Sequence, residues 1–313
     1  MSVVFGPVPS RRLGMSLGIN NIPDKVCSYA CVYCQIGRTL RMEVARRKFY
    51  DPEVIVREVE EHVESIGENV NVDYVTFVPD GEPTLDANLG RTTELLKDLG
   101  YRLAILTNSS LLWKEDVRED LSLFDYVSLK LDAVSEGIWR KVDRPHKGLN
   151  LERIMEGMLE FSGAFRGKLV TETMLINVDY GDELRRIADF LADLKPDVAY
   201  IGVPTRPPTE RWVKPANEVT LNEAYNLFSK AVKTEYLIGY EGNAFASTGN
   251  FEEDVLNITA VHPMRREAVE ELMRKDGADW ETVERLVREG KLVRVTYEGE
   301  TFYMRKLRSR EGR

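Results

Sequence analysis

Three cysteines lie within a window of eight residues, and the rest of the chain contains none. They are Cys27, Cys31 and Cys34, in the spacing Cys-x₃-Cys-x₂-Cys. An odd number of thiols so close together suits metal binding better than disulfide bonds. Three cysteines can hold a 4Fe–4S cluster while one of its irons stays open to a small ligand. The spacing therefore predicts one such cluster, with these three cysteines as its ligands.

A reduced structural group of thiols would also account for the cysteines, and so would a zinc site with a fourth ligand from elsewhere in the chain. Zinc sites usually show paired Cys-x₂-Cys segments or histidines nearby. The three histidines, His62, His146 and His262, are all distant in sequence from the cysteines. We therefore favour the iron–sulfur cluster.

The cysteine spacing, with the aromatic Tyr33 directly before the last cysteine, resembles the radical S-adenosylmethionine (SAM) superfamily. The resemblance implies that Cys27, Cys31 and Cys34 form the catalytic centre by holding one 4Fe–4S cluster. It implies that the open iron binds the amino and carboxylate groups of SAM, and that Tyr33 lies against the adenine. Reduction of the cluster then yields methionine and a 5′-deoxyadenosyl radical, so the resemblance implies two cofactors, the cluster and SAM.

A second motif follows the predicted strand at residues 74–78. It is Gly81-Glu82-Pro83, and in the resembled family a Gly-Glu-Pro segment at this strand end binds the amino group of SAM. The residue types suit that role, because glycine permits close approach of the backbone and a carboxylate favours an ammonium group. The family pattern has two glycines, and Asp80 stands where the first would be.

Further polar residues stand at the ends of predicted strands, where parallel sheets gather ligands. Asn108 follows the third strand, Lys130 and Asp132 flank the end of the fourth, and Glu172 lies within the fifth. The resemblance implies that Lys130 and Asp132 hold the ribose hydroxyls and the carboxylate of SAM. Because a buried charge needs a partner, we expect Glu172 and Lys130 to face the interior and each other.

Two segments rich in proline and arginine are predicted to be functional loops. They are residues 5–14, before the first predicted strand, and residues 204–215, after the sixth. Arginine binds carboxylates and phosphates with paired hydrogen bonds. We therefore expect an anionic substrate to be held by the arginines of these loops, namely Arg11, Arg12, Arg206 and Arg211.

Apolar strand patterns alternate with helical patterns from residue 15 to about residue 205. Strands are predicted at residues 15–22, 74–78, 102–106, 126–131, 168–176 and 198–203, and helices at residues 51–65, 84–99, 150–161 and 181–194. This alternation implies parallel strands joined by right-handed crossovers. About six units are too few for a closed barrel of eight. We therefore expect an α/β fold, a partial (β/α)6 barrel, which the resemblance also implies.

The composition changes towards the C-terminus. Helices are predicted at residues 263–274 and 279–289 and a β-hairpin at residues 292–305, an arrangement that resembles a winged helix. We therefore expect two domains, residues 1–250 for the cluster and SAM and residues 251–313 as a winged-helix-like domain. The smaller domain is slightly basic, and it could bind nucleic acid, dock a protein or peptide, or only cap the barrel. Acidic residues on its second helix weaken the nucleic-acid interpretation.

The composition of the 313 residues places further limits on function. The net charge of −9 argues against a surface that coats nucleic acid nonspecifically. No run of about 18 apolar residues is present, and the first residues show no secretory pattern, so we expect a cytoplasmic protein that does not associate with membranes.

Within the superfamily, the chain resembles the iron–sulfur oxidoreductases related to wyosine-forming tRNA enzymes, and more distantly the glycyl-radical activating enzymes. Unlike the wyosine group, it has no cysteine for a second cluster. The leading hypothesis is a radical SAM enzyme that abstracts hydrogen from a tRNA base or a protein, with ferredoxin or flavodoxin as electron donor. The alternatives are a redox-sensing regulator that binds DNA through its winged unit, and a zinc-dependent binding module.

Overall fold

The computed structural model describes residues 2–23, 25–67, 70–239, 242–243 and 245–306. Within these residues, eight strands form one sheet in the order β1-β2-β5-β6-β7-β8-β9-β10. Every pair from β2 to β10 is parallel, whereas β1 runs antiparallel to β2. The strands are β1 (Val4–Ser10), β2 (Gly14–Ile19), β5 (Tyr74–Phe77), β6 (Leu103–Thr107), β7 (Tyr126–Lys130), β8 (Lys168–Met174), β9 (Val198–Gly202) and β10 (Thr234–Leu237).

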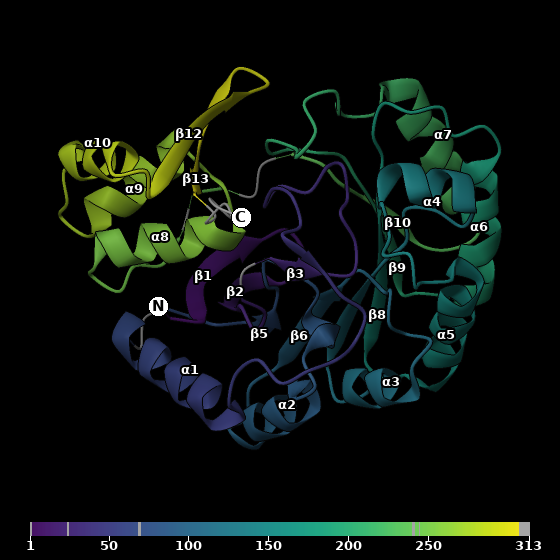
Figure 1. Ribbon diagram of the computed structural model, residues 1–313, viewed down its shortest axis with the longest axis horizontal. Coiled ribbons are helices and arrows are strands. Elements are labelled where there is room, and N and C mark those ends of the chain that lie inside the picture. Colours follow the sequence, from purple (N-terminus) through teal and green to yellow (C-terminus); the bar gives the residue numbers. More distant parts are fainter. Residues whose placement is uncertain (1, 24, 68–69, 240–241, 244, 307–313) are drawn as a thin grey trace.

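Helices surround this sheet on its outer side, and the strands lie inside the arc that they form (Figure 1). Each of these helices lies in the connection between two parallel strands, as crossover connections require. They are α1 (Pro52–Ile66), α2 (Leu89–Asp98), α3 (Glu115–Leu121), α4 (Glu136–Val142), α5 (Leu151–Ala164), α6 (Glu183–Leu194) and α7 (Glu218–Phe228), with a short 3₁₀ helix at Pro83–Leu85. The predicted α/β architecture with a mainly parallel sheet is confirmed.

Helix α1 shows how the local sequence fixes an element. Asp51 caps it by accepting a hydrogen bond from the Glu53 amide at 3.0 Å, and Pro52 occupies its first turn. Ile55 and Val59, four residues apart, are fully buried against the sheet. These signals are the ones that predict a helix at residues 51–65.

The alternation of side chains along the strands separates the core from the site. On β7, Val127 and Leu129 belong to the apolar core that the helices cover. Tyr126, Ser128 and Lys130 take the alternate positions and therefore face the opposite side of the sheet. Lys130, at the carboxyl end of the strand, lines a cavity that also contains the three cysteines. The last residue of this mainly apolar strand therefore places a charged side chain in the site.

Two strands of the sheet were not predicted, and one helix starts later than predicted. The segment at residues 5–14 is not a loop, because Val4–Ser10 forms β1 and only the turn before Gly14 is irregular. Its prolines fit an edge strand, because an edge strand has a neighbour on one side only and can lack N–H donors on the other side. The short β10 raises the parallel strands among the described residues from six to seven. The helix predicted from residue 84 begins at Leu89, after the 3₁₀ turn.

The C-terminal unit comprises α8 (Phe251–Val261), β11 (Met264–Arg265), α9 (Arg266–Lys275), α10 (Trp280–Arg288), β12 (Leu292–Tyr297) and β13 (Glu300–Arg305). Its three strands pair antiparallel in the order β11-β13-β12. The predicted helices and hairpin are present, and α8 is an additional helix. The last part of the predicted domain, residues 307–313, lies outside the described residues.

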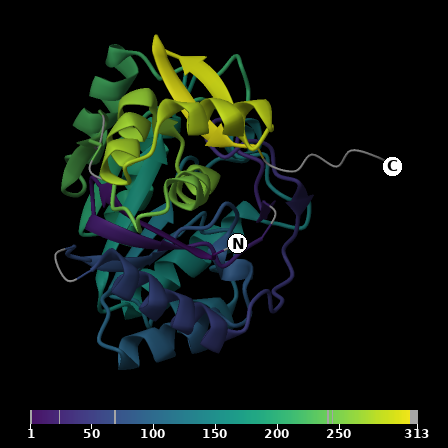
Figure 2. The ribbon, with the colours of Figure 1, turned by 90° about the vertical axis from the view of Figure 1, so that its left-hand side faces the viewer.

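The C-terminal unit packs on β1 at the edge of the large sheet (Figures 1 and 2). Phe5 and Val8 of β1 belong to the same buried apolar cluster as Val255 and Ile258 of α8. This shared cluster joins the unit to the sheet. Among the described helices, none is long and apolar enough to cross a membrane.

Candidate active site

The cysteine loop follows β2 and is fixed by main-chain hydrogen bonds to neighbouring segments. The amide of Val32 donates to the carbonyl of Val142 at 2.9 Å, and the amide of Ala30 donates to that of Asp143 at 3.0 Å. A short strand pair, β3 (Val26–Cys27) with β4 (Arg41–Met42), holds the start of the loop. The loop is therefore anchored at several points before any ligand binds.

All three thiols line one cavity of about 310 Å³ at the carboxyl ends of the strands. Within the described part of the chain, no three Cys, His, Asp or Glu side chains converge closely enough to hold one metal ion. Three thiols on one cavity supply three sulfur ligands, the ligand type that iron–sulfur clusters use. This donor set fits a 4Fe–4S cluster.

Each cysteine sulfur has a nitrogen donor beside it. Such donors stabilise negative charge on sulfur and tune the potential of a cluster. The pairs are Lys25 Nζ to Cys34 Sγ at 2.9 Å, Lys130 Nζ to Cys31 Sγ at 2.8 Å and Asn108 Nδ2 to Cys27 Sγ at 3.5 Å. Lys25 was missed by the sequence analysis, although its place two residues before Cys27 offered a signal.

The three thiols differ in acidity. Burial raises the pKa of Cys27 to about 11 and raises the pKa of Cys31 well above its ordinary value. Burial acts on Cys34 as well, but the Lys25 ammonium, the Ile36 amide and Lys130 together outweigh it and lower the pKa of Cys34. Cys34 is therefore the thiol most readily deprotonated, and binding of a metal must displace the protons of the other two.

The Gly81-Glu82-Pro83 segment packs directly against the start of the cysteine loop. The amide of Glu82 donates to the carbonyl of Val26 at 3.1 Å. A Cβ atom added at Gly81 would lie 1.9 Å from that same carbonyl oxygen, so only glycine fits there. The motif thus brings the end of β5 against the cysteine loop, and Pro83 begins the 3₁₀ turn that leads away.

The Glu82 carboxylate is buried and engaged by donors of the protein. It accepts hydrogen bonds from the hydroxyls of Thr84 and Thr107, both at 2.6 Å, and from the amide of Asn108 at 2.7 Å. Burial raises the pKa of Glu82, against the lowering effect of these donors. The side chain therefore fastens the end of β6 to the motif and positions Asn108.

Lys130 is the centre of a buried charged network. Its ammonium pairs with Asp132 at 3.2 Å and with Asp143, and the Tyr33 hydroxyl donates to Asp132. The ammonium also lies 5.0 Å from the centre of the Tyr33 ring. Asp143 was missed by the sequence analysis, because it follows α4 without any local motif.

The expected pairing of Lys130 with Glu172 is wrong. The two residues are register partners on β7 and β8, so both face the cavity as expected. Glu172 nevertheless forms an ion pair with Arg12, which lies in the turn between β1 and β2. Lys130 instead forms its ion pairs with Asp132 and Asp143. The error arises because strand β1 was not predicted, and the turn that follows β1 places Arg12 beside Glu172 of β8.

Most predicted site residues gather at this cavity. Besides the cysteines, its lining includes Tyr33, Gly81, Glu82, Asn108, Lys130, Glu172, Arg11, Arg12 and Arg206. Pro83 and Asp132 are not part of the lining, and Asp132 acts on it through Tyr33 and Lys130. Arg211 is exposed and does not line the cavity, so its predicted contact with substrate is not supported.

The chain is similar in sequence to a described family and to several curated proteins. The model of the family described as the Radical SAM superfamily matches residues 22–191. A UPF0026 protein of Methanocaldococcus jannaschii is 47% identical over 99% of this chain and 98% of its own length. A putative glycyl-radical enzyme activating enzyme of the same organism is 28% identical over 62% of this chain and 70% of its length.

Solved structures share the fold at low sequence identity. SuiB of Streptococcus suis bound to S-adenosylmethionine superimposes with a TM-score of 0.52 and 14% identity, over 71% of this chain and 50% of that one. TYW1 with a lysine-pyruvate adduct superimposes with a TM-score of 0.52 and 15% identity, over 69% of this chain and 74% of that one.

Proposed function

Because the chain belongs to the radical SAM superfamily, whose enzymes use a 4Fe–4S cluster and SAM, we propose that Cys27, Cys31 and Cys34 hold that cluster. When bound and reduced, the cluster supplies the electron that cleaves SAM into methionine and a 5′-deoxyadenosyl radical, which abstracts hydrogen from the substrate. The observation that carries the proposal is the convergence of all three thiols on the cavity that the Gly-Glu-Pro segment also lines.

The surrounding residues divide the binding of SAM between them. The backbone carbonyl of Gly81, which lines the cavity, accepts the amino group, with Glu82 and Pro83 fixing that backbone. The Lys130 ammonium attracts the SAM carboxylate. The side-chain amide of Asn108 donates a hydrogen bond to the Cys27 sulfur. Tyr33 offers its ring to the adenine, and Asp132 fixes the ring by accepting a hydrogen bond from the Tyr33 hydroxyl.

The C-terminal unit is a winged-helix-like domain in this proposal. Its order of helix, strand, two helices and hairpin is typical of winged helices, in which α10 would be the recognition helix. Arg285 of α10 pairs with Glu252 and with Glu289, so its charge is largely compensated within the unit. This pairing disfavours the alternative of a DNA-binding redox sensor.

A relation to the wyosine-forming enzymes is part of the same proposal. The fold shared with TYW1 is compatible with it, and the single cluster separates this chain from the two-cluster chemistry expected of that group. A tRNA base and a polypeptide are the substrate classes that the sequence predicts, and ferredoxin or flavodoxin is the proposed electron donor. The arginines that line the cavity favour a substrate that carries negative charge.

Anaerobic reconstitution with iron and sulfide tests the function. We expect about four irons per chain and production of 5′-deoxyadenosine from SAM after reduction by dithionite. Alanine at any one of the three cysteines should abolish both, whereas Arg38→Gln, an exposed change in the same loop, should leave both intact. Stoichiometric zinc without iron, or a loaded cluster that does not cleave SAM, would refute the proposal.

The regulator alternative has its own test. It requires tight, salt-dependent binding of duplex DNA that disappears when the cluster is removed. Fluorescence anisotropy with a labelled duplex, measured on cluster-loaded and cluster-free protein, gives the answer. We expect weak binding that does not depend on the cluster.

A further inference from the structure

Two serines beside the cysteine loop are buried, and no step of the proposed function uses them. Ser28 directly follows Cys27, and Ser110 lies in the loop after β6. Both residues are fully buried, and their hydroxyl oxygens lie 2.5 Å apart in a hydrogen bond that joins the two loops. Neither serine lines the cysteine cavity, so their hydroxyls reach it through a neighbouring side chain.

That side chain is the amide of Asn108. Its Nδ2 group donates to Ser28 Oγ at 2.9 Å and to the Cys27 sulfur at 3.5 Å. At the other end of the amide, Oδ1 accepts a hydrogen bond from the main-chain N–H of Ser110 at 3.0 Å. Because a main-chain N–H can only donate, Oδ1 must face Ser110, and the NH₂ group must therefore face Cys27.

The two hydroxyls continue this arrangement in one direction. Ser28 Oγ accepts a hydrogen bond from the Asn108 amide, so the Ser28 proton is directed to its other partner, Ser110 Oγ. Hydrogen bonds that run in one direction polarise one another, which strengthens each of them. If the Asn108 amide were reversed, its NH₂ group would face the Ser110 N–H, and two buried donors would oppose each other.

The orientation of an amide decides whether it attracts or repels a negative sulfur. Cys31 and Cys34 each lie beside a lysine ammonium, which carries donors only. Cys27 lies instead beside the neutral Asn108 amide, which has a donor at one end and an acceptor at the other. The contacts with Ser28 and Ser110 therefore determine the sign of the interaction at Cys27.

We propose that Ser28 and Ser110 are positioning residues, which hold the Asn108 NH₂ group on the Cys27 sulfur and thereby raise the reduction potential of the cluster. The inference rests on the proposed function, because it concerns the cluster that the three cysteines are proposed to hold. Reduction adds one electron and so makes the cluster more negative. A donor on a ligand sulfur stabilises that additional charge, and hydrogen bonds to sulfur are among the features that set the potential of such clusters.

A redox titration of the cluster-loaded protein with dithionite, monitored by electron paramagnetic resonance without SAM, tests this role. We expect Ser28→Ala to lower the reduction potential, because the NH₂ group loses the acceptor that holds it beside Cys27. Ser110→Ala keeps the main-chain N–H that fixes Oδ1, so we expect a smaller shift in the same direction. Asn108→Ala removes the donor itself and should lower the potential at least as much as Ser28→Ala.

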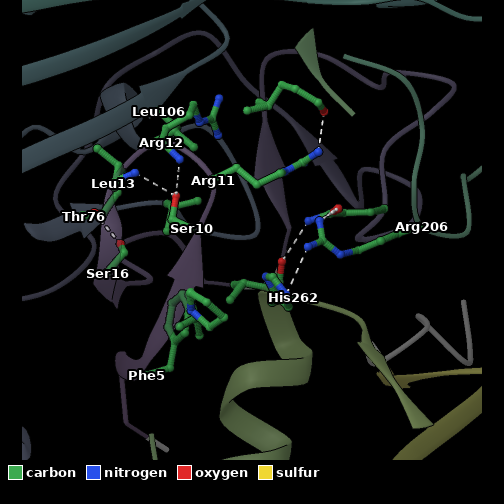
Figure 3. Close-up of a pocket in the computed structure, with 16 residues that line it drawn as sticks. Phe5, Ser10, Arg11, Arg12, Leu13, Ser16, Thr76, Leu106, Arg206 and His262 are labelled. Carbon is green, nitrogen blue, oxygen red and sulfur yellow. Dashed lines mark hydrogen bonds between the residues drawn. The ribbon is translucent and has the colours of Figure 1, made fainter. Parts of the chain in front are cut away.

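A combination of two substitutions shows whether Ser28 acts through Asn108. Adding Ser28→Ala to Asn108→Ala should cause no further shift, since the amide that the serine positions is already absent. Ser16→Ala is the matched control, because Ser16 is a buried serine that is hydrogen-bonded to Thr76 at 2.7 Å (Figure 3). Ser16 does not line the cysteine cavity, so its variant should lose a similar hydrogen bond and keep the wild-type potential.

Three outcomes would overturn the positioning role. They are a wild-type potential in Ser28→Ala, an equal shift in Ser16→Ala, and a further shift when Ser28→Ala is added to Asn108→Ala. Iron content and SAM cleavage of the wild type, measured in parallel, report on the proposed function. A wild type that loads no cluster would refute both proposals, whereas a loaded cluster whose potential does not respond to Ser28→Ala would refute only the positioning role.

Discussion

The side-chain amide of Gln35 donates a hydrogen bond to the main-chain carbonyl of Val261 at 3.2 Å. Gln35 directly follows Cys34, and Val261 is the last residue of α8. The cysteine loop is therefore tied to the C-terminal unit within one residue of a proposed cluster ligand. Together with the apolar cluster on β1, this bond makes the C-terminal unit part of the framework around the site.

Removing apolar volume from α8 should therefore affect the whole molecule. Ile258 is 1% exposed and shares a cluster with Phe5 of β1. We expect Ile258→Ala to lower the free energy of unfolding by about 2–5 kcal/mol, because a buried cavity replaces the lost side chain. Urea denaturation followed by far-UV circular dichroism and by the visible absorbance of the cluster measures the effect.

Both signals should shift together in that experiment, since one apolar cluster joins the two parts. Val293→Ala, which truncates a side chain 38% exposed on β12, should change the midpoint little. A transition in which circular dichroism shifts while the cluster absorbance keeps its wild-type midpoint would show that the C-terminal unit unfolds independently.

Glu82 offers a prediction that separates positioning from direct binding. In Glu82→Gln, a side-chain NH₂ group replaces one acceptor oxygen and must face the main-chain N–H of either Asn108 or Thr84, neither of which can accept a hydrogen bond. A donor that faces another buried donor costs about 1–3 kcal/mol. We expect lower stability and weaker SAM binding, measured by denaturation and by equilibrium dialysis of the cluster-loaded protein.

The exposed change Glu64→Gln is the matched control for that substitution. If Glu82→Gln weakens SAM binding while stability stays at the wild-type value, the carboxylate acts on the ligand directly. Such a result would contradict the role of Glu82 in positioning Asn108.

The site could be predicted from sequence where the chemistry is local. The cysteine spacing and the Gly-Glu-Pro segment are each contiguous, and both line the cavity where they were expected. Apolar patterns longer than a few residues likewise predicted six of the parallel strands, because two-sided burial leaves a continuous apolar run.

The partners of the charged residues could not be predicted in the same way. Asp143 reaches Lys130 only because the loop after α4 folds back, and Arg12 reaches Glu172 only because β1 forms an edge strand. The prolines and glycine of β1 hide its strand pattern. Strand β10 is as long as the predicted β5, but it carries the charged Glu235 and is only partly buried, so it shows no apolar run. Ion pairs between distant segments depend on topology rather than on spacing.

Asp86 predicts a dependence of stability on pH. Its side chain is fully buried, and burial raises its pKa from 3.8 to about 6. The folded state therefore binds the proton more tightly than the unfolded state, so the stabilising contribution is present below pH 4 and is lost as the pH rises through 6. We expect the stability of Asp86→Asn relative to the wild type to rise by on the order of 1–3 kcal/mol between pH 5.5 and pH 8, because only the wild-type side chain loses a proton over this range.

Urea midpoints at pH 8, 6.5 and 5.5 measure that difference, which should shrink as the pH falls. Asp98→Asn, an exposed change at the end of α2, should show no such trend. An advantage of Asp86→Asn that stays constant over this range would exclude titration of Asp86 as its cause.

The Lys130 network gives the largest expected effect. The side chains of Asp132 and Asp143 are 1% and 3% exposed, so Lys130→Met would leave two buried carboxyl groups without their cation. We expect a loss of about 3–5 kcal/mol in stability, because a broken buried ion pair leaves uncompensated charge. Lys141→Met, an exposed change on α4, is the matched control.

The double variant Lys130→Met with Asp143→Asn distinguishes loss of charge balance from loss of packing. Burial already raises the pKa of Asp143 to about 7 despite the lowering effect of Lys130. Without the lysine, a neutral side chain at position 143 therefore avoids the cost of burying an uncompensated carboxylate. We expect the double variant to recover about 1–3 kcal/mol relative to Lys130→Met, as a coupled pair should. Strictly additive losses in the urea midpoints would mean that Lys130 stabilises the site by packing alone.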